Sequence, residues 1–333
     1  MSGLIRTFVS ALSLGTLALG GLALAVAEPA MAQTKWNLPS AYPTDNFHTE
    51  NLARFAKDVE TATNGKLVIT LHPNASLFKA PEIKRAVATG QAQAGEVLMS
   101  IHENEDPIFG IDVIPFLATS HEQARKLWQV SRPAVEKKLA SQGLMVLYTV
   151  PWPPQGLFSK TPVATLADLK GAKWRAYNPG TARIGEAVGA QSVTVQQAEL
   201  AQALATGVVT ALITSAATGY DVKIWESIPY FYDVQAWLPK NMVFVNKAAF
   251  DALDKPTQDD LLKAAAAAEE RGWQLSIEKS KWFMEQLKGH GMKIEPPSAD
   301  LRAGFQKIGE QLTADWLKKS GPGGEAIIEA FRK

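Results

Sequence analysis

The 333-residue chain contains no cysteine. That absence excludes disulfide bonds, thiolate metal sites and cysteine nucleophiles. The chain also has little excess charge, because 34 lysines and arginines nearly balance 33 aspartates and glutamates, for a net charge of +1. Binding to a nucleic-acid backbone needs a cationic excess, so nucleic acid is not expected as a partner. With 46% hydrophobic and 20% charged residues, the composition indicates one large or two ordinary globular domains.

Sequence motifs that mark common enzymes are also missing. His102 and His121 are each followed by glutamate, as in zinc proteases, but the position four residues later holds Asp106 or Arg125 instead of a second histidine. No nucleophile elbow, phosphate-binding glycine loop or dinucleotide fingerprint is present. We therefore expect that the protein is not an enzyme. An exported enzyme acting on a small carboxylate is the alternative.

Long hydrophobic runs are absent after residue 32, so no membrane-spanning segment is expected there. Before it, the uncharged run Phe8–Val26 follows the early cation Arg6 and leads to Ala30-Met31-Ala32. This pattern predicts a cleaved signal peptide over residues 1–32, with an uncleaved membrane anchor as the alternative. No cysteine is available at the cleavage site for a lipoprotein anchor. We expect the mature protein in the periplasm of a Gram-negative bacterium.

Hydrophobic patterns in the first half of the mature chain predict alternating strands and helices. Extended runs over residues 35–40, 67–71 and 95–100 are separated by amphipathic helices, and Ile111–Leu117 is predicted as a further strand. This order is typical of a parallel α/β architecture. Ligand sites in such folds lie beyond the carboxyl ends of the strands.

A proline-rich break, Pro151–Gly156, interrupts the alternation, and a second α/β series follows it. The chain then enters a long helix that is predicted to start near Pro256 and to end by Gly289 or Gly291. One or two last helices are expected over Ser298–Lys333, interrupted at Gly321. The break indicates a crossover between two domains.

The segment Leu166–Arg175, LADLKGAKWR, resembles the hallmark stretch of the DctP family, the extracytoplasmic solute receptors of tripartite ATP-independent periplasmic (TRAP) transporters. The resemblance continues through Glu186–Ala190 and Ala203–Val209 and covers essentially all of residues 35–330. It implies a two-domain α/β periplasmic binding protein fold with an interdomain ligand cleft and a long C-terminal connecting helix.

The domains implied by this resemblance are each built from two stretches of chain. Domain I is expected to comprise residues 33–153 plus about 240–285, including the long helix. Domain II is expected to comprise residues 154–239 plus about 286–333, including the C-terminal helices. The crossing strands and the long helix would join them.

Arg175 is the residue to which the resemblance assigns the clearest role. In such receptors the arginine at this place pairs with the substrate carboxylate. A planar guanidinium matches a carboxylate with two parallel charge-assisted hydrogen bonds, which a desolvated cleft strengthens. The alternative is an arginine that is exposed to water or pairs with a structural acid.

The chain departs from the family pattern at several positions around the expected cleft. An asparagine-containing segment that touches ligand in the family is replaced here by hydroxyl residues, including Thr214 and Ser215. Where many members carry a second arginine, this chain has Gln155, which offers a donor and an acceptor. The tryptophan and acid that hold a metal in one branch have no counterpart at Ser215 and Ala216. No cofactor is therefore expected, and calcium is disfavoured.

Aromatic residues are frequent in the predicted cleft loops. They would stack on the apolar face of a ring-shaped acid while hydroxyls and Gln155 meet its polar edge. One carboxylate is expected, because no second matching cation is evident, which favours a sugar acid or an aromatic acid over a four-carbon dicarboxylate. The aromatics near the cleft are Tyr42, Phe47, Trp152, Tyr177 and Tyr220. The expected ligand-binding residues are Arg175, Gln155, Thr214, Ser215, Tyr220, Asn178, Phe47, His48 and Trp152.

These observations predict a monomeric periplasmic receptor that captures a small organic anion between two domains. Its second partner would be the membrane-embedded TRAP permease, which receives the closed form. Two further alternatives would also capture a ligand between two domains. They are a binding protein of an ABC transporter and a sensor subunit whose closed form binds a kinase.

Overall fold

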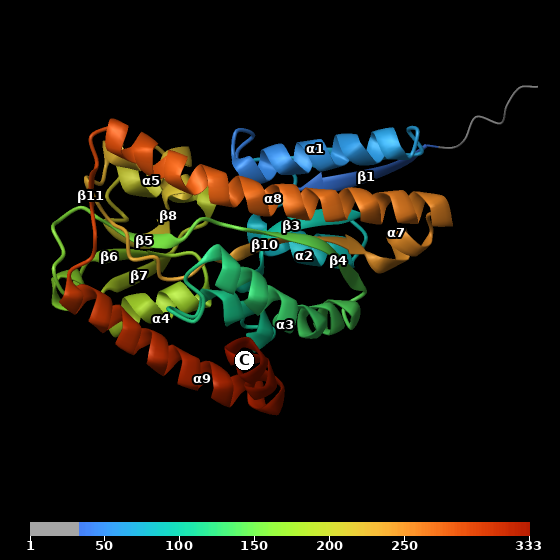
Figure 1. Cartoon of the computed structure of the whole chain (residues 1–333). Coiled ribbons are helices and arrows are strands. Elements are labelled where there is room, and N and C mark those ends of the chain that lie inside the picture. The colour runs from blue at the N-terminus through green and yellow to red at the C-terminus, as the bar shows by residue number, and fades with distance from the viewer. Residues whose placement is uncertain (1–32) are drawn as a thin grey trace, which may run out of the picture. The chain divides into compact units, whose positions relative to one another are not determined.

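The structure, a computed structural model, describes residues 33–333, which form one compact unit (Figure 1). The predicted signal peptide, residues 1–32, lies outside the described residues. No helix within the described range is both long enough and apolar enough to cross a membrane. The strands are β1 (Thr34–Pro39), β2 (Leu67–His72), β3 (Ala94–Leu98), β4 (Leu144–Pro151), β5 (Gln155–Ser159), β6 (Lys173–Ala176), β7 (Gln191–Thr194), β8 (Ala211–Ser215), β9 (Tyr230–Tyr232), β10 (Lys240–Asn246) and β11 (Lys293–Glu295).

Helices cover the sheets and follow most of the predicted positions. The α-helices are α1 (Phe47–Ala62), α2 (Ala80–Ala88), α3 (His121–Ala140), α4 (Pro179–Ala187), α5 (Gln197–Ala205), α6 (Ala216–Asp221), α7 (Lys247–Asp251), α8 (Lys255–Gly289) and α9 (Ala299–Arg332). The short 3-10 helices are η1 (Met99–His102), η2 (Pro107–Val113), η3 (Leu166–Leu169) and η4 (Ile224–Glu226).

The strands form three hydrogen-bonded sheets. Two are small: β1 pairs with β2 in parallel, and β3, β10 and β4 form an antiparallel sheet with β10 in the middle. The third has the order β11-β9-β5-β8-β6-β7 and mixes parallel with antiparallel pairs. The purely parallel arrangement expected from the alternation is therefore wrong, because β5 and β10 come directly from crossover segments and run opposite to their neighbours. We call the part built on the two small sheets the small-sheet side and the other part the six-stranded side.

The predicted strand over Ile111–Leu117 is also wrong, because residues 111–113 end the 3-10 helix η2 and residues 114–117 form a bend and a turn. Asp106 accepts a hydrogen bond from the Ile108 amide (3.1 Å) and Pro107 occupies the first turn, so the local residues start a helix. The apolar run is buried, as predicted for a core segment, but buried helix and buried strand have the same apolar composition.

Two antiparallel crossover segments connect the sides. The Trp152 amide donates to the Pro239 carbonyl (2.8 Å), and the Gln155 amide donates to the Trp237 carbonyl (2.9 Å). Proline favours extended chain and forbids helix, which explains why Pro151–Gly156 runs straight from one side to the other. The predicted crossover is therefore present.

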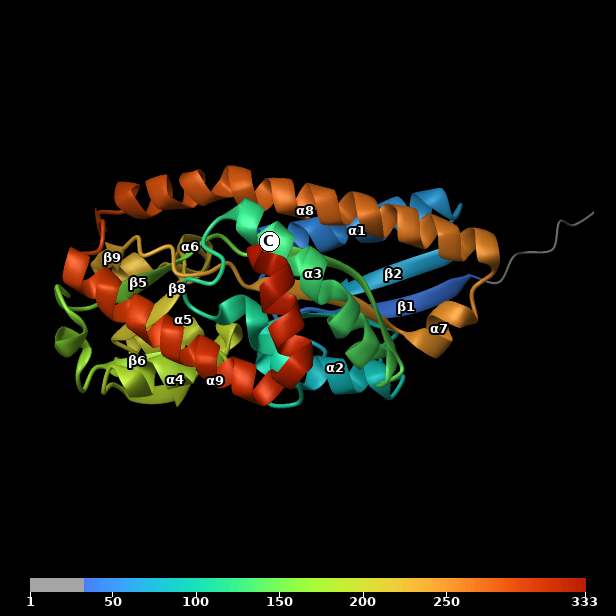
Figure 2. The same ribbon diagram turned by 60° about the horizontal axis from the view of Figure 1, so that its bottom comes forward.

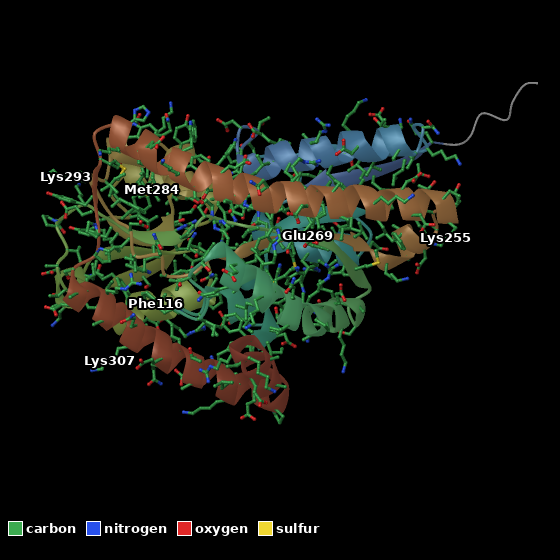
Figure 3. The ribbon with its side chains drawn as sticks, in the orientation of Figure 1. Phe116, Lys255, Glu269, Met284, Lys293 and Lys307 are labelled. Atoms are coloured by element: carbon green, nitrogen blue, oxygen red, sulfur yellow. The ribbon has the colours of Figure 1, made fainter. Side chains whose placement is uncertain are left out.

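Helix α8 runs along both sides of the unit (Figures 1 and 2). Near its middle, Glu269 accepts hydrogen bonds from the backbone and hydroxyl of Thr149 on β4, at 3.0 and 3.2 Å (Figure 3). Helix α9 lies below it in Figure 1 and bends at Gly321, whose φ of 60° favours glycine. After the bend, Ile328 is buried in a cluster with Leu127 of α3. The domain boundaries given above stay a prediction.

Candidate functional site

A pocket lies where the two sides meet, beside the crossover segments. It contains about 480 Å³ of empty space, including the part open to solvent. Its aromatic lining residues are Tyr42, Trp152 and Tyr177, and its polar lining residues are Arg175, Gln155, Gln196, Gln197, Thr214 and Thr218. Four of the expected site residues, Arg175, Gln155, Thr214 and Trp152, therefore line one pocket.

Arg175 is a buried cation in the wall of this pocket. It lies on β6, is 3% exposed, and its Nε donates to the Val195 carbonyl (2.8 Å). The guanidinium carbon is 4.9 Å from the centre of the Tyr177 ring. Within residues 33–333 no carboxylate forms an ion pair with it, and burial lowers its pKa to about 10. Among the described residues, the guanidinium therefore uses only its Nε for a hydrogen bond, and its other edge has no anionic partner.

Gln155 and Tyr177 form a hydrogen-bonded chain beside Arg175. The Tyr177 hydroxyl donates to Gln155 Oε1 (3.2 Å) and accepts from Trp237 Nε1 (3.1 Å). Gln155 Nε2 donates one of its two hydrogens to the Pro153 carbonyl (2.9 Å). The oxygen of Gln155 is thus occupied, and the amide keeps one N–H for a ligand. Tyr177, in turn, is held with its ring against the guanidinium.

The hydroxyl residues of β8 and α6 take two different positions. Thr214 is buried and lines the pocket. Ser215 is buried too, but it caps α6 by accepting a hydrogen bond from the Thr218 amide (3.2 Å) and does not line the pocket. Thr218 does line it, although the sequence reasoning did not select it.

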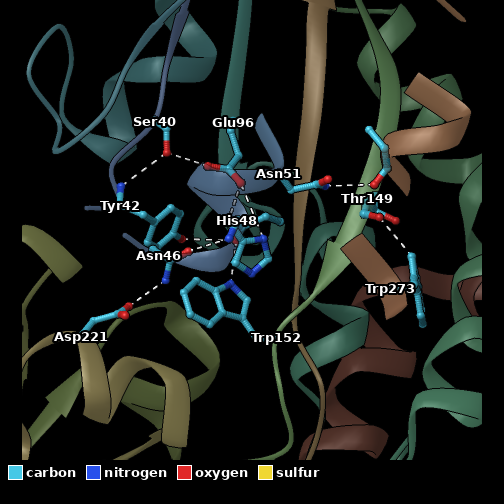
Figure 4. A network of polar contacts seen from close by, with 12 residues as sticks. Ser40, Tyr42, Asn46, His48, Asn51, Glu96, Thr149, Trp152, Asp221 and Trp273 are labelled. Carbon is cyan, nitrogen blue, oxygen red and sulfur yellow. Dashed lines mark hydrogen bonds and ion pairs between the residues drawn. The ribbon is translucent and has the colours of Figure 1, made fainter. Parts of the chain in front are cut away.

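Tyr42 and Trp152 form the aromatic wall on the small-sheet side. Their ring centres are 5.1 Å apart, with an angle of 57° between the planes. Both donate to the same atom, Asn241 Oδ1, from the Tyr42 hydroxyl (3.2 Å) and from Trp152 Nε1 (2.9 Å). Figure 4 shows the network behind this wall, in which Ser40 and Glu96 also take part.

His48 and Phe47 lie behind the aromatic wall and do not line the pocket. The His48 ring centre is 4.3 Å from that of Trp152, and Phe47 packs edge-on to Trp152 at 5.6 Å. His48 is 1% exposed, and burial holds its pKa well below the ordinary value, so the ring is neutral near pH 7. Both residues support the wall by packing.

Asn178 and Tyr220 also lie outside the lining. Asn178 caps α4 through the Thr181 amide (2.7 Å), and its Nδ2 donates across the two sides to Ser100 Oγ (2.7 Å). Tyr220 packs against Trp282 of α8, with ring centres 5.0 Å apart. Asparagine followed by proline is a common start of a helix, so the local sequence already indicates that Asn178 caps α4.

Gln197 is a lining residue that sequence reasoning missed. It begins α5, two residues after Val195, whose carbonyl accepts from Arg175. Its Nε2 is buried without a hydrogen-bond partner in the described chain. A glutamine after a strand of a parallel pair was the available signal, since such junctions face ligand sites. Within residues 33–333, no cluster of three or more histidines, aspartates or glutamates is placed to hold a metal ion.

Comparison with known proteins identifies the class to which this fold and pocket belong. Residues 40–320 match DctP, the bacterial extracellular solute-binding protein family 7, and the chain belongs to that family. The Bordetella pertussis extracytoplasmic solute receptor DctP6, which binds pyroglutamic acid, is 57% identical, with a TM-score of 0.89 over 90% of this chain and 99% of that one.

Two other relatives agree with this assignment. A TRAP solute-binding protein from an unidentified marine microbe, in complex with co-purified pyroglutamate, is 45% identical, with a TM-score of 0.89, and covers 90% of this chain and 99% of its own. The 2,3-diketo-L-gulonate-binding periplasmic protein YiaO of Escherichia coli is 26% identical over 88% of this chain and 90% of its own.

The chain is therefore an extracytoplasmic solute receptor of the TRAP type, a binding protein and not an enzyme. The predicted family, α/β periplasmic binding protein fold, function and periplasmic location are confirmed. The roles of the individual site residues stay predictions.

Proposed function

We propose that the ligand is pyroglutamate, the five-membered lactam of glutamate. Three observations support it: the 57% identical Bordetella pertussis receptor and the marine relative bind this acid, and the pocket has one buried cation beside aromatic rings. Pyroglutamate is a ring with one carboxylate, which agrees with the expectation of a single-carboxylate cyclic acid. Pyroglutamate is a ring-shaped acid, as expected from the sequence, but it is neither of the two kinds that the sequence favoured, a sugar acid or an aromatic acid.

Arg175 would bind the carboxylate. This is the single observation that carries the proposal: a guanidinium that is 3% exposed, donates from Nε to the Val195 carbonyl and has no carboxylate partner within residues 33–333. A ligand carboxylate would complete it with two hydrogen bonds to the remaining edge. Because the site is desolvated, the charge pair would be stronger there than on the surface.

The lactam edge would be bound by the amides and hydroxyls of the six-stranded side. A lactam has one acceptor, the ring carbonyl, and one donor, the ring N–H. Gln197 Nε2 is buried and has no hydrogen-bond partner in the described part of the chain, so it is suited to donate to the ring carbonyl. Thr214, also in the lining, is suited to accept from the ring N–H. The rings of Tyr42 and Trp152 would contact the apolar CH₂ face.

The predicted domains I and II would close on the ligand and present it to the TRAP permease in the membrane. Contacts that cross between the two sides around the pocket support this mode of action. They are the Asn178–Ser100 and Asn46–Asp221 hydrogen bonds (both 2.7 Å) and the Glu103–Arg183 ion pair. These contacts are compatible with a closed state that ligand would favour by bridging the sides.

Calorimetry on ligand-free protein tests the proposal. The mature chain is unfolded, washed and refolded to remove any co-purified ligand, then titrated with pyroglutamate, gluconate, proline and glutamate. Stoichiometric binding of pyroglutamate, at least about tenfold tighter than that of the other three, is expected from a pocket matched to a neutral lactam and one carboxylate. Binding of gluconate without binding of pyroglutamate would overturn the assignment.

A further inference from the structure

Asn241 and Glu96 form a buried polar pair that does not line the pocket. Asn241 is the second residue of β10, which pairs with β3, the strand that carries Glu96, and the two residues are 1% and 2% exposed. Asn241 Nδ2 donates to Glu96 Oε1 (3.0 Å) across 145 positions of sequence. Neither residue belongs to the pocket lining described above.

The orientation of the Asn241 amide is decided by chemistry. Trp152 Nε1 can only donate, so the Asn241 atom that faces it is the oxygen, and Glu96 Oε1 accepts from the amide nitrogen on the other side. Asn241 therefore must turn its oxygen toward Trp152 and its nitrogen toward Glu96. The same oxygen also accepts from the Tyr42 hydroxyl, so one atom holds two rings of the pocket wall.

Glu96 is surrounded by groups from several elements. Ser40 Oγ, just after β1, donates to its Oε2 (2.6 Å), and His48 Nδ1 on α1 lies 3.7 Å from its Oε1. On β4, burial and, to a smaller extent, the charge of Glu96 raise the pKa of Tyr148. His48 is neutral and buried, and its Nδ1 makes no hydrogen bond in the described chain. Asn241 and Ser40 are thus the groups that hold the carboxylate and, through Asn241, the rings.

We propose that the Glu96–Asn241 pair is the positioning device of the receptor: it sets ligand affinity by fixing Tyr42 and Trp152, without touching the ligand. A flat ring ligand gains contact only where the wall is already in place, because ordering two aromatic side chains on binding costs conformational entropy. This inference rests on the proposed function for the identity of the ligand, but the pair would act in the same way on any cyclic acid.

The polarity of the pair can be broken and restored by substitution. Asn241→Asp keeps the oxygen that accepts from Tyr42 and Trp152. It replaces the amide nitrogen that donates to Glu96 by a second carboxylate oxygen. We expect affinity for pyroglutamate to fall about 30-fold, since two buried carboxylates in contact repel and one must take up a proton. In Glu96→Gln/Asn241→Asp the new glutamine can donate to the new aspartate, so affinity is expected to recover to within about fivefold of the wild type.

A matched control lies on the same strand. Asn246, at the far end of β10, donates through Nδ2 to the Val87 carbonyl (2.9 Å) and caps α7 through Oδ1 (3.0 Å). Asn246→Asp keeps that cap and lies away from the pocket, so it is expected to leave affinity unchanged. Melting temperatures of all variants show whether each is folded.

The experiment measures the dissociation constant of pyroglutamate by calorimetry for the wild type, both Asn→Asp variants and the double variant. Rescue in the double variant supports the pair, because a general loss of stability would add rather than cancel. A double variant as weak as Asn241→Asp, or an Asn241→Asp affinity equal to that of the wild type, would overturn it. If Asn241→Asp does not fold, Tyr42→Phe removes one tether alone, and an unchanged affinity then contradicts the inference.

The two proposals fail in different ways. If the wild type does not bind pyroglutamate, the ligand assignment fails, and the same variants are titrated with the acid that binds, identified by mass spectrometry of ligand released on unfolding. If the wild type binds pyroglutamate and no rescue occurs, only the positioning role fails.

Discussion

The two sides of the pocket differ in the partners that they give to a buried ionisable side chain. On the six-stranded side, Arg175 is buried with one backbone hydrogen bond and no carboxylate partner in the described chain. On the small-sheet side, Glu96 is equally buried but accepts hydrogen bonds from Ser40 and Asn241. A buried charge without a partner costs free energy, and hydrogen bonds to a buried carboxylate reduce this cost without removing it. The difference indicates that the six-stranded side has a hydrogen-bonding group available for a ligand, whereas the polar groups behind the small-sheet side are bonded to one another.

This contrast also separates binding from positioning. We propose that the Arg175 guanidinium recognises the anion, because no carboxylate within residues 33–333 pairs with it and its second hydrogen-bonding edge is unused there. The proposed role of Glu96 is to position, because it accepts from the Asn241 amide whose oxygen accepts from Tyr42 and Trp152. In this proposal, two buried ionisable residues serve different purposes because the fold gives them different partners.

The largest effect is expected from removing the unpaired charge. Arg175→Ala should weaken pyroglutamate binding by about 3 to 5 kcal/mol, because the ligand carboxylate would be buried without a cation. Arg175→Lys should retain part of the affinity, since an ammonium keeps the charge but loses the two parallel hydrogen bonds. Calorimetry measures both. Arg302→Ala, at an exposed arginine on α9, is the control, and equal affinities for the Arg175 and Arg302 alanine variants would refute the contrast.

The second effect concerns stability and pH on the opposite wall. Burial raises the pKa of Glu96 from 4.5 to about 7. Between these pH values the folded protein keeps the proton and the unfolded chain loses it, so this contribution to stability is present below about pH 4.5 and is lost as pH rises to about 7. Relative to Glu96→Gln, which does not titrate, the wild type should lose about 3 kcal/mol over this range, from a shift of about 2.5 pKa units.

Urea unfolding of both proteins between pH 5 and 8 checks this prediction. Only the difference between the two proteins is used, because burial lowers the pKa values of His102 and His121 to about 4, which makes stability rise with pH in the same range. A difference that stays constant with pH would show that Glu96 does not titrate there.

A smaller effect is expected from the lactam edge. Gln197→Leu should weaken pyroglutamate binding about tenfold, because the ring carbonyl would lose its donor in a buried place. The loss should be smaller for tetrahydrofuran-2-carboxylate, a ring acid that lacks this carbonyl. Gln202→Leu, at an exposed position of the same helix, is the matched control for calorimetry. Equal losses for the two acids would contradict a contact between Gln197 and the ring carbonyl.

The smallest effect is expected at the contact that joins the two walls. Ser100→Ala removes the acceptor of the Asn178 Nδ2 hydrogen bond but leaves the Asn178 cap of α4 intact. Affinity should fall about threefold, the equivalent of one hydrogen bond that forms only on closure. Faster ligand release in stopped-flow measurements would accompany it. An unchanged release rate would mean that this contact does not hold the closed state.

Local patterns predicted most of the elements but not their pairing. The helix over residues 121–141 and the long helix near Pro256 follow from periodicity and caps, and the structure has them as α3 and α8. The short strands β9 and β11 were missed, because three residues carry too little pattern. The direction of β10 was missed because it depends on the crossover that precedes it.

The candidate site shows the same limit. Arg175 was found because its segment resembles a family motif, and Gln155 because it stands where many family members carry a second arginine. Glu96 and Asn241 were not found, since they lie 145 positions apart and each is an ordinary polar residue in its own strand. His48 was placed in the site because it begins a helix near the cleft, yet it packs behind the wall.

The sequence by itself determined the class of the protein, its export, its expected single-carboxylate ligand and the cation that would bind it. These properties depend on composition and on short contiguous motifs, which are independent of how distant segments meet. Only the tertiary structure decided which polar residues are partnered and which are not. The cost of burying a polar group depends on neighbours brought from distant positions, and that cost distinguishes Arg175 from Glu96.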